Sequence, residues 1–363
     1  MARFRRWRSF LSISSLLILF VAITVTTNLF LATRLPLVAP PLLWENEKKF
    51  SSENGMLHMV ITRFMQSQSH LYTLGRARMA LFETFCLPSM KIQLAKDYIW
   101  LIMVDPDLNL ELLDRFKQLL GEYPNFYLIL SNENTLTQRN YEDLTASRRI
   151  LTGNLERLES VLFDDSRPLL LQTRLDADDG LHRKTLLLLQ KTAKNMSNSI
   201  DGWKIICDDI HLEWRNDEIT SNNTSVETSG KLRIVREGIC VTPGYTLVQY
   251  RESGQTKLPP RPKIPHHKVT SNWPECGVSA VPVNCWTKLK RFPAALRSRT
   301  ITSAGMSRIQ SNEGTDIYDN QTYMLWPHVT EDFGVQQKHA IQTSRLLKEN
   351  VYGIAKENLE GQW

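Results

Sequence analysis

The spacing of apolar runs between residues 56 and 194 is the sequence feature that most constrains the fold of this chain. Four short apolar runs have the length and composition of buried strands: residues 56–64, 98–104, 126–130 and 168–173. Four longer segments have helical periodicity: residues 76–93, 110–121, 153–163 and 182–194. Pro88 is expected to break or kink the first of these helices. Strands that alternate with helices predict an α/β fold whose mixed, mostly parallel sheet is flanked by helices.

Three carboxylates, Asp176, Asp178 and Asp179, directly follow the fourth apolar run and define an acidic loop. Ligands of open α/β sheets bind at the carboxyl ends of the strands, where this loop is expected. Clustered carboxylates repel one another, so a bound cation stabilises them. Mn²⁺ and Mg²⁺ prefer oxygen ligands and often bind through one or two carboxylates together with substrate phosphates. The loop therefore predicts a metal site for a nucleotide-diphosphate sugar, whose departing diphosphate the metal would stabilise as a Lewis acid.

A solvated turn is the alternative interpretation of the acidic loop, because an Asp-x-Asp tripeptide is common. The apolar strand before it and the helix after it favour a functional site. The loop does not fit an EF-hand, which needs further ligands at fixed spacing through a distal Glu.

Polar residues near other strand ends are candidates for donor binding. Thr62 and Arg63 end the first apolar run and are expected to hold the base or the ribose. Arg76 and Arg78 are expected to meet the diphosphate, since guanidinium groups bind phosphate oxygens bidentately. A solvated helix face is the alternative for Arg78.

Two further candidates lie beside predicted strand ends. Asp105 follows a buried strand as Asp176 does, and is expected to contact the ribose or the nucleotide. Arg174 precedes the acidic loop and is expected to balance its charge or to bind the donor.

The second half of the chain has weaker patterns. Strands are expected at residues 202–207, 231–241 and 245–250, loops at 255–267 and 292–306, and an amphipathic terminal helix from about residue 335. Arg297 and Arg299 lie beside small residues and suit a mobile phosphate-binding loop, for which an ordinary exposed loop is the alternative.

A catalytic base is required if the transfer inverts the anomeric centre, because a carboxylate must then deprotonate the acceptor hydroxyl. The candidates are Asp208, Asp209, Glu331 and Asp332. A retaining transfer would not need this base, and the sequence does not choose between the two outcomes.

The amino terminus predicts a membrane anchor. Residues 10–32 carry no charge and form a run long enough to cross a bilayer as a helix. Four arginines precede it, at positions 3, 5, 6 and 8, so the positive-inside rule places this end in the cytosol. We expect a cytosolic tail at 1–9, a transmembrane signal anchor at 10–32, a stem at 33–55 and a catalytic domain at 56–363. A cleaved signal peptide or a transit peptide is the alternative.

Several features fit a type II protein whose catalytic domain lies in the lumen of the Golgi or endoplasmic reticulum. Four sites match the N-glycan acceptor pattern, at Asn195, Asn222, Asn223 and Asn320. The five cysteines suit an oxidising compartment if some of them pair: Cys86, Cys207, Cys240, Cys276 and Cys285. The net charge of +6 includes the four amino-terminal arginines, so it gives little support to a nucleic-acid partner.

Five segments carry a resemblance to a known family: residues 60–64 (VITRF), 78–89 (RMALFETFCLPS), 100–106 (WLIMVDP), 123–126 (YPNF) and 173–182 (TRLDADDGLH). In this order they resemble the putative rhamnosyltransferase family. The resemblance implies a GT-A-like glycosyltransferase fold, a nucleotide-sugar donor and a divalent metal. Residues 326–329 look like a late family segment, and many GT-A enzymes complete the metal site with a late histidine. His328 is the candidate, with His266 and His267 as rivals.

These observations favour a metal-dependent glycosyltransferase that moves a sugar, which the resemblance names as rhamnose, to a glycan or another hydroxyl acceptor. Two alternatives remain open. One is a non-catalytic luminal carbohydrate-binding protein with the same fold, and the other is a metal-dependent transferase or hydrolase acting on phosphate esters.

Overall fold

The computed structural model describes residues 55–133, 138–163, 169–196, 203–208, 210–216, 230–236, 243–250, 286–289, 294–303, 315–316 and 322–360. All of them lie in the second of the two units into which the chain divides, Ser51–Trp363. The predicted tail, the membrane anchor at 10–32 and residues 33–54 of the stem lie outside the described residues, as do Asp209, His266 and His267. In the part of the chain that the structure describes, no helix is long and apolar enough to cross a membrane.

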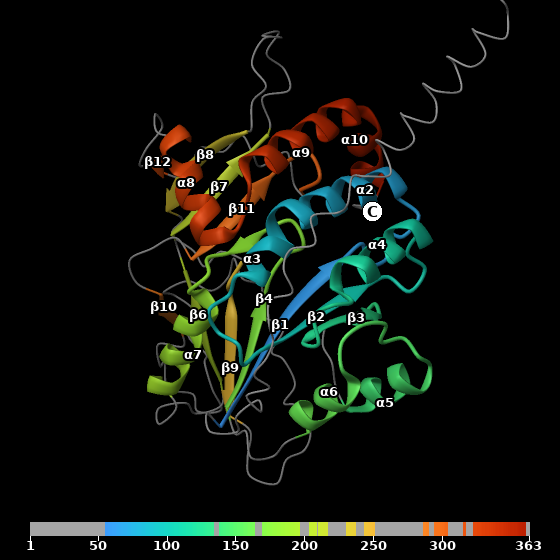
Figure 1. The fold of residues 1–363 in the computed structure, drawn as a ribbon, viewed down its shortest axis with the longest axis vertical. Helices are drawn as coiled ribbons and strands as arrows, with labels where there is room; N and C mark the ends of the chain where they lie inside the picture. The colour runs from blue at the N-terminus through green and yellow to red at the C-terminus, as the bar shows by residue number, and fades with distance from the viewer. Residues whose placement is uncertain are drawn as a thin grey trace, which may run out of the picture. The chain divides into compact units, whose positions relative to one another are not determined.

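A sheet of seven described strands forms the centre of the fold (Figure 1). Its strand order is β10(Trp286–Lys288), β6(Trp203–Cys207), β9(Thr246–Tyr250), β4(Leu169–Arg174), β1(Met56–Phe64), β2(Ile99–Val104) and β3(Phe126–Leu130). All neighbouring pairs are parallel except those of β9, which runs antiparallel to β4 and β6. The mixed, mostly parallel sheet predicted from the apolar runs is therefore confirmed.

The helices between the first strands begin and end where the sequence places suitable caps. Helix α4(Leu110–Leu120) starts at Asn109, whose side chain accepts a hydrogen bond from the Glu111 N–H. Helix α6(Leu155–Leu162) starts in the same way at Asn154. Both helices bury one apolar face, as their periodicity predicts. Helix α5(Gln138–Ala146) was not predicted, because its sequence is mostly polar.

The helix expected at residues 76–93 begins earlier and is interrupted earlier than predicted. It consists of α2(Tyr72–Leu81), the π-helix η2(Phe82–Cys86) and α3(Leu87–Lys91). Pro88 does not end it, because a proline is tolerated in the first turn of the short α3 segment. The irregularity lies one turn before Pro88, in the wider π turn.

A second sheet has the order β12(Thr315–Asp316), β8(Lys231–Arg236), β7(Ile210–Arg215), β11(Ala295–Arg299) and β5(Gly180–Leu181). The prediction of a loop at residues 292–306 was wrong for residues 295–299, which form β11. Strands β7 and β5 were not predicted either. Apolar residues of both β7 and β11 pack in the core, while the polar residues of β11 gave that segment the appearance of a loop.

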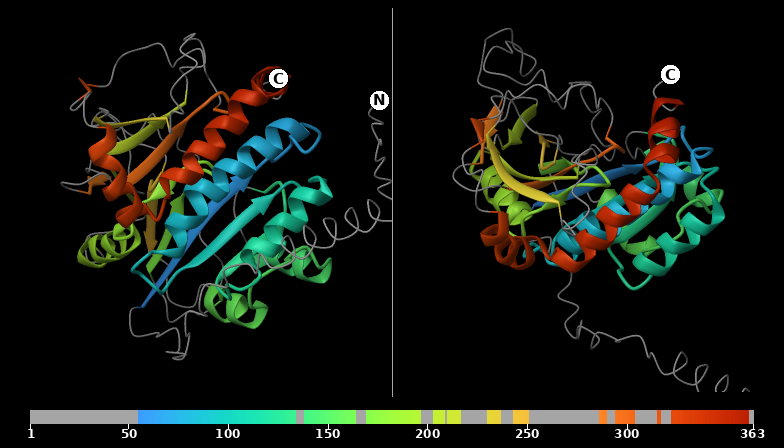
Figure 2. Two further views of the ribbon diagram at one scale, coloured as in Figure 1. Left: turned by 45° about the horizontal axis from the view of Figure 1, so that its top comes forward. Right: turned by 90° about the horizontal axis from the view of Figure 1, so that it is seen from above.

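Helix α7(Thr185–Met196) follows β5, and three helices end the described chain: α8(Thr322–Phe333), α9(Gln337–Glu349) and α10(Val351–Glu360). The single terminal helix predicted from residue 335 is thus two helices. Helices α2 and α9 run side by side (Figures 1 and 2). Just beyond α2, a buried hydrogen bond of 2.7 Å joins the hydroxyl groups of Thr84 in the π-helix and Thr343 in α9.

Phe82 is a test of the packing between the helix layer and the sheet. Its fully buried ring stacks on Trp100 at 5.8 Å and meets Phe116 edge-on at 4.9 Å. We expect Phe82→Ala to lower the free energy of unfolding by about 3–5 kcal/mol, because it leaves a cavity between α2, α4 and β2. Urea unfolding measures this loss. Leu110→Ala is the control, since Leu110 is 72% exposed and its truncation is expected to change stability little.

Candidate donor and metal site

The acidic loop lies where the order of strands in the sheet reverses. The chain passes from β1 to β2 and β3 on one side, and then returns to place β4 on the other side of β1. The carboxyl ends of β1 and β4 therefore lie together, and such switch points are ligand-binding positions in open α/β sheets. Beyond the end of β4, the Leu175 N–H donates to the Ile61 carbonyl at 3.1 Å. The Asp179 N–H closes the loop onto the Asp176 carbonyl at 3.1 Å.

Two carboxylates of this loop are held away from bulk water. Asp178 is half-buried and Asp179 is buried. Burial, and then the negative charge of Asp176, raise the pKa of Asp178. Burial and the charges of Asp178 and Asp176 likewise raise the pKa of Asp179. The loop therefore favours a proton, a cation or a cationic partner at neutral pH.

Arg78 supplies positive charge to the loop from helix α2. Its charge acts on Asp178 and Asp176, and lowers the pKa of Asp178. The guanidinium is fixed by a hydrogen bond of 2.6 Å to Gln68 Oε1 and by one of 3.3 Å to the Thr302 carbonyl. The structure therefore brings Arg78 to the predicted site.

Arg63 and Arg174 flank the loop at the ends of β1 and β4. Ile61 and Arg174 are paired in the register of the two strands, and the charge of Arg63 interacts with both Arg174 and Asp176. Arg174 Nε lies 3.2 Å from Asp176 Oδ1. Both arginines thus lie beside the acidic loop, where Arg174 was expected, and a contact of Arg63 with the base or the ribose stays a prediction.

Arg297 and Ser298 reach the loop from β11. The positive charge of Arg297 lowers the pKa of both Asp178 and Asp179. The Ser298 N–H donates to Asp179 Oδ1 at 2.8 Å. Sequence reasoning missed Ser298, because a backbone donor brought from another strand leaves no mark in the sequence.

Arg299 lies on strand β11 and not in the predicted loop. Its Nε lies 3.3 Å from Oε2 of Glu213, which is buried and also lies 2.7 Å from Arg233 Nη2. Burial raises the pKa of Glu213, but the hydrogen bond from His211 and the charge of Arg233 outweigh it and hold that pKa well below its usual range. Arg299 therefore belongs to an ion-pair network on the second sheet.

Thr62 and Asp105, which were predicted to contact the nucleotide, form hydrogen bonds to other residues of the protein. Thr62 is fully buried, and its hydroxyl accepts from Trp100 Nε1 at 2.9 Å. Asp105 is also buried, and its two oxygens accept from the N–H groups of Ser67 at 2.7 Å and Asp107 at 2.8 Å. Asp105 thus holds the loop after β1, in which Ser67 has a positive φ of 59°. That loop in turn presents Gln68 to Arg78, so Asp105 supports the site indirectly.

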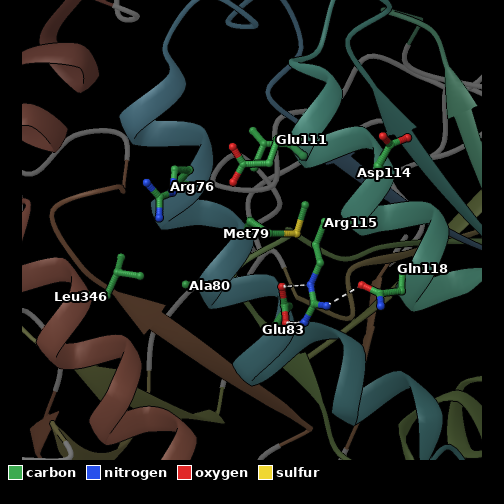
Figure 3. A pocket seen from close by; sticks show the side chains of 10 residues that line it. Arg76, Met79, Ala80, Glu83, Glu111, Asp114, Arg115, Gln118 and Leu346 are labelled. Atoms are coloured by element: carbon green, nitrogen blue, oxygen red, sulfur yellow. Dashed lines mark hydrogen bonds and ion pairs between the residues drawn. The ribbon is translucent and has the colours of Figure 1, made fainter. Parts of the chain in front are cut away.

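Arg76 lies away from the acidic loop. It is exposed and lines a groove of about 550 Å³ between α2, α4 and α9, shown in Figure 3. The groove contains Glu83, which forms an ion pair of 2.5 Å with Arg115, and none of the residues of the acidic loop. The prediction that Arg76 meets the diphosphate is therefore not supported.

The structure places the candidate bases Asp208, Glu331 and Asp332 in different surroundings. Asp208 is buried, and its oxygens accept from the N–H groups of Ile210 at 3.1 Å and Ala294 at 3.0 Å, which does not support its role as a base. Glu331 and Asp332 pair with Arg183, at 2.9 Å and 3.2 Å. Asp332 also lies 3.4 Å from His182, shortly after the acidic loop. A base role for Glu331 or Asp332 stays a prediction.

The predicted four-residue metal site is not formed by the side chains. Among the described residues, no three His, Cys, Asp or Glu side chains gather closely enough to hold a metal ion. His328 is exposed on α8, and Asp179 is directed to the Ser298 N–H. A cation held by Asp176 and Asp178 together with substrate phosphates needs only two protein carboxylates, and these oxygen donors fit Mn²⁺ or Mg²⁺.

The comparison with known families agrees with this geometry. Residues 66–201 match the model of a family described as "Putative rhamnosyl transferase". This match supports the resemblance to the rhamnosyl transferase family. The rhamnosyl transferase segment includes α2, the π-helix and the whole acidic loop, and its family description supports a glycosyltransferase in general terms. No curated protein matches the chain.

The charge of the acidic loop predicts a pH-dependent cost to stability. The pKa of Asp178 is raised in the folded state, so ionisation of this carboxyl is less favourable in the folded than in the unfolded protein. The resulting loss of free energy of unfolding begins above the unfolded pKa of about 3.9 and grows as pH rises through the folded pKa. We expect Asp178→Asn to raise the melting temperature at pH 7 in EDTA by about 2 °C, and the gain to shrink toward pH 4. Thermal unfolding between pH 4 and 8 measures this difference.

Asp114→Asn is the matched control, since Asp114 lies on the surface of α4 and forms a solvent-exposed pair with Lys117. Its melting temperature should stay close to the wild-type value across this range. A lower melting temperature of Asp178→Asn at pH 7 would contradict the electrostatic account of the loop.

Proposed function

We propose that this protein is a metal-dependent glycosyltransferase, which moves a sugar from a nucleotide-sugar donor to a hydroxyl group of a glycan or another acceptor. The observation that carries the proposal is the acidic loop at the switch point between β1 and β4, whose Asp178 interacts with the positive charges of Arg78 and Arg297. The rhamnosyl transferase segment supports it, and makes nucleotide-activated rhamnose the first donor to test.

The charges around the loop suit a nucleotide diphosphate. Asp176 and Asp178 would hold Mn²⁺ or Mg²⁺, which would stabilise the negative charge of the departing diphosphate. Arg63, Arg78 and Arg174 lie around these carboxylates and can bind phosphate oxygens that enter with the cation. The arginines also limit the repulsion between the carboxylates before the ligand binds.

We propose further that the protein is a single-pass type II membrane protein of the Golgi or endoplasmic reticulum, with the catalytic domain in the lumen. The uncharged run at 10–32 and the four arginines before it support this topology. Two structural findings agree with a luminal domain. Cys207 is disulfide-bonded, and the glycan acceptor Asn195 is exposed in the last turn of α7.

Donor turnover tests the proposed activity. The full-length chain in detergent is incubated with Mn²⁺ and a panel of nucleotide sugars, and release of nucleoside diphosphate is measured. We expect turnover of at least one donor, inhibition by EDTA, and a loss of about 100-fold or more in Asp178→Ala, because this variant removes a carboxylate from the proposed cation site. Asp114→Ala removes a surface carboxylate from α4 and should keep wild-type activity.

Absence of both transfer and hydrolysis with every donor would contradict the proposal of a glycosyltransferase. Metal-independent binding of a carbohydrate without turnover would then favour the non-catalytic luminal binding protein. Release of phosphate from simple phosphate esters, with nucleotide sugars ignored, would favour the third interpretation.

Protease protection tests the proposed topology. In sealed microsomes, added protease should remove only the short tail before residue 10, because the remainder would lie inside the vesicle. Peptide-N-glycosidase should also lower the apparent mass, and Asn195→Gln should abolish one glycan step. Digestion of the domain after residue 56 in intact vesicles would contradict this orientation.

A further inference from the structure

Two buried polar side chains contact the chain immediately after the acidic loop: Ser89 in α3, and Gln93 two residues after the end of this helix. The hydrogen bonds of both side chains go to backbone groups and not to the acidic carboxylates. We propose that Ser89 and Gln93 are positioning residues, which fix β5 and thereby set the geometry of the acidic loop. This inference rests on the proposed function, because it concerns the same donor and metal site.

Ser89 holds Leu181, the second residue of β5. Its Oγ accepts from the Leu181 N–H at 3.1 Å and donates to the Cys86 carbonyl at 2.8 Å. The hydroxyl thus connects the π turn of the helix to the strand that follows Asp179. With Ser89 fully buried, no water can replace this acceptor without a change in the packing.

Gln93 holds the residues that follow. Its Nε2 lies within hydrogen-bonding distance of the carbonyls of Leu181 at 3.2 Å and His182 at 3.1 Å, and its Oε1 accepts from the Leu186 N–H at 3.4 Å. One buried side chain therefore joins the end of β5 to the first turn of α7. Any other position of this segment would leave buried donors and acceptors without hydrogen bonds. The free-energy cost of such unpaired groups favours the observed position.

Gly180 shows how closely the helix and the loop approach each other. A Cβ atom at this position would lie 3.1 Å from the Phe85 carbonyl and 3.3 Å from Ser89 Cβ. A glycine permits this close contact between the π turn and β5, because an added Cβ would displace its neighbours by a few tenths of an ångström. On the other side, β5 pairs with β11, and the Ser298 N–H holds Asp179. The segment after Asp178 is thus fixed between α3 and β11.

The test compares Ser89→Ala, Gln93→Met and Ser89→Thr with the wild-type full-length chain. Ser89→Ala removes the hydroxyl, Gln93→Met removes the polar groups at similar volume, and Ser89→Thr retains a hydroxyl. Ser160→Ala is the matched control, since Ser160 is exposed on α6 and its hydroxyl bonds only within that helix, to the Arg157 carbonyl. The first readout is amide hydrogen exchange, which requires no ligand.

We expect Ser89→Ala and Gln93→Met to exchange at least 10-fold faster in peptides covering residues 176–186, with β1 to β3 unchanged. The second readout is Mn²⁺ binding, followed by the electron paramagnetic resonance of the free ion, together with turnover of the donor found in the panel. The dissociation constant for Mn²⁺ and the KM should rise about 3- to 10-fold, and Ser89→Thr should recover most of the loss.

Unchanged exchange at 176–186 in both variants would overturn the proposal. Faster exchange with wild-type Mn²⁺ affinity and kinetics would also overturn it, since the contacts would then be structural only. If the wild type neither binds Mn²⁺ nor turns over any donor, the proposed function fails. In that case the exchange result alone decides whether Ser89 and Gln93 position the loop.

Discussion

The interaction on which the rest of the site depends is the repulsion between carboxylates held away from water in the loop after β4. Burial and mutual charge raise the pKa of Asp178 and Asp179, so the fold must supply compensation from outside the loop. It does so from two elements, through Arg78 on α2 and through Arg297 and the backbone N–H of Ser298 on β11. A loop that only turned the chain would need no such convergence.

Much of the first half of the fold could be predicted from the sequence, because each buried strand is a continuous apolar run. The strands at residues 56–64 and 126–130 were predicted with the observed boundaries. The π turn was not predictable, because the apolar residues around it continue the periodicity of an ordinary helix. The strand at 295–299 was missed, because alternate positions carry Arg297 and Arg299 and the run looks like a polar loop.

The sequence could predict the site residues that lie at the carboxyl ends of buried strands. Arg63, Arg174 and the acidic loop follow from the topology of a parallel sheet, and Arg78 lies within reach from its helix. Thr62 and Asp105 also lie at strand ends, but the structure buries them with internal partners. A sequence pattern shows which residues are near a site, whereas the direction of each side chain depends on partners distant in the chain.

The packing of α2 against the terminal helices has a consequence for synthesis of the protein. The Leu74 N–H, at the start of the helix that carries Arg78 and Ser89, donates to Glu357 Oε2 on α10 at 2.7 Å. This contact joins positions that are 283 residues apart. The first strands of the central sheet can begin to assemble during translation, but the helix that carries Arg78 lacks this contact until Glu357 has left the ribosome.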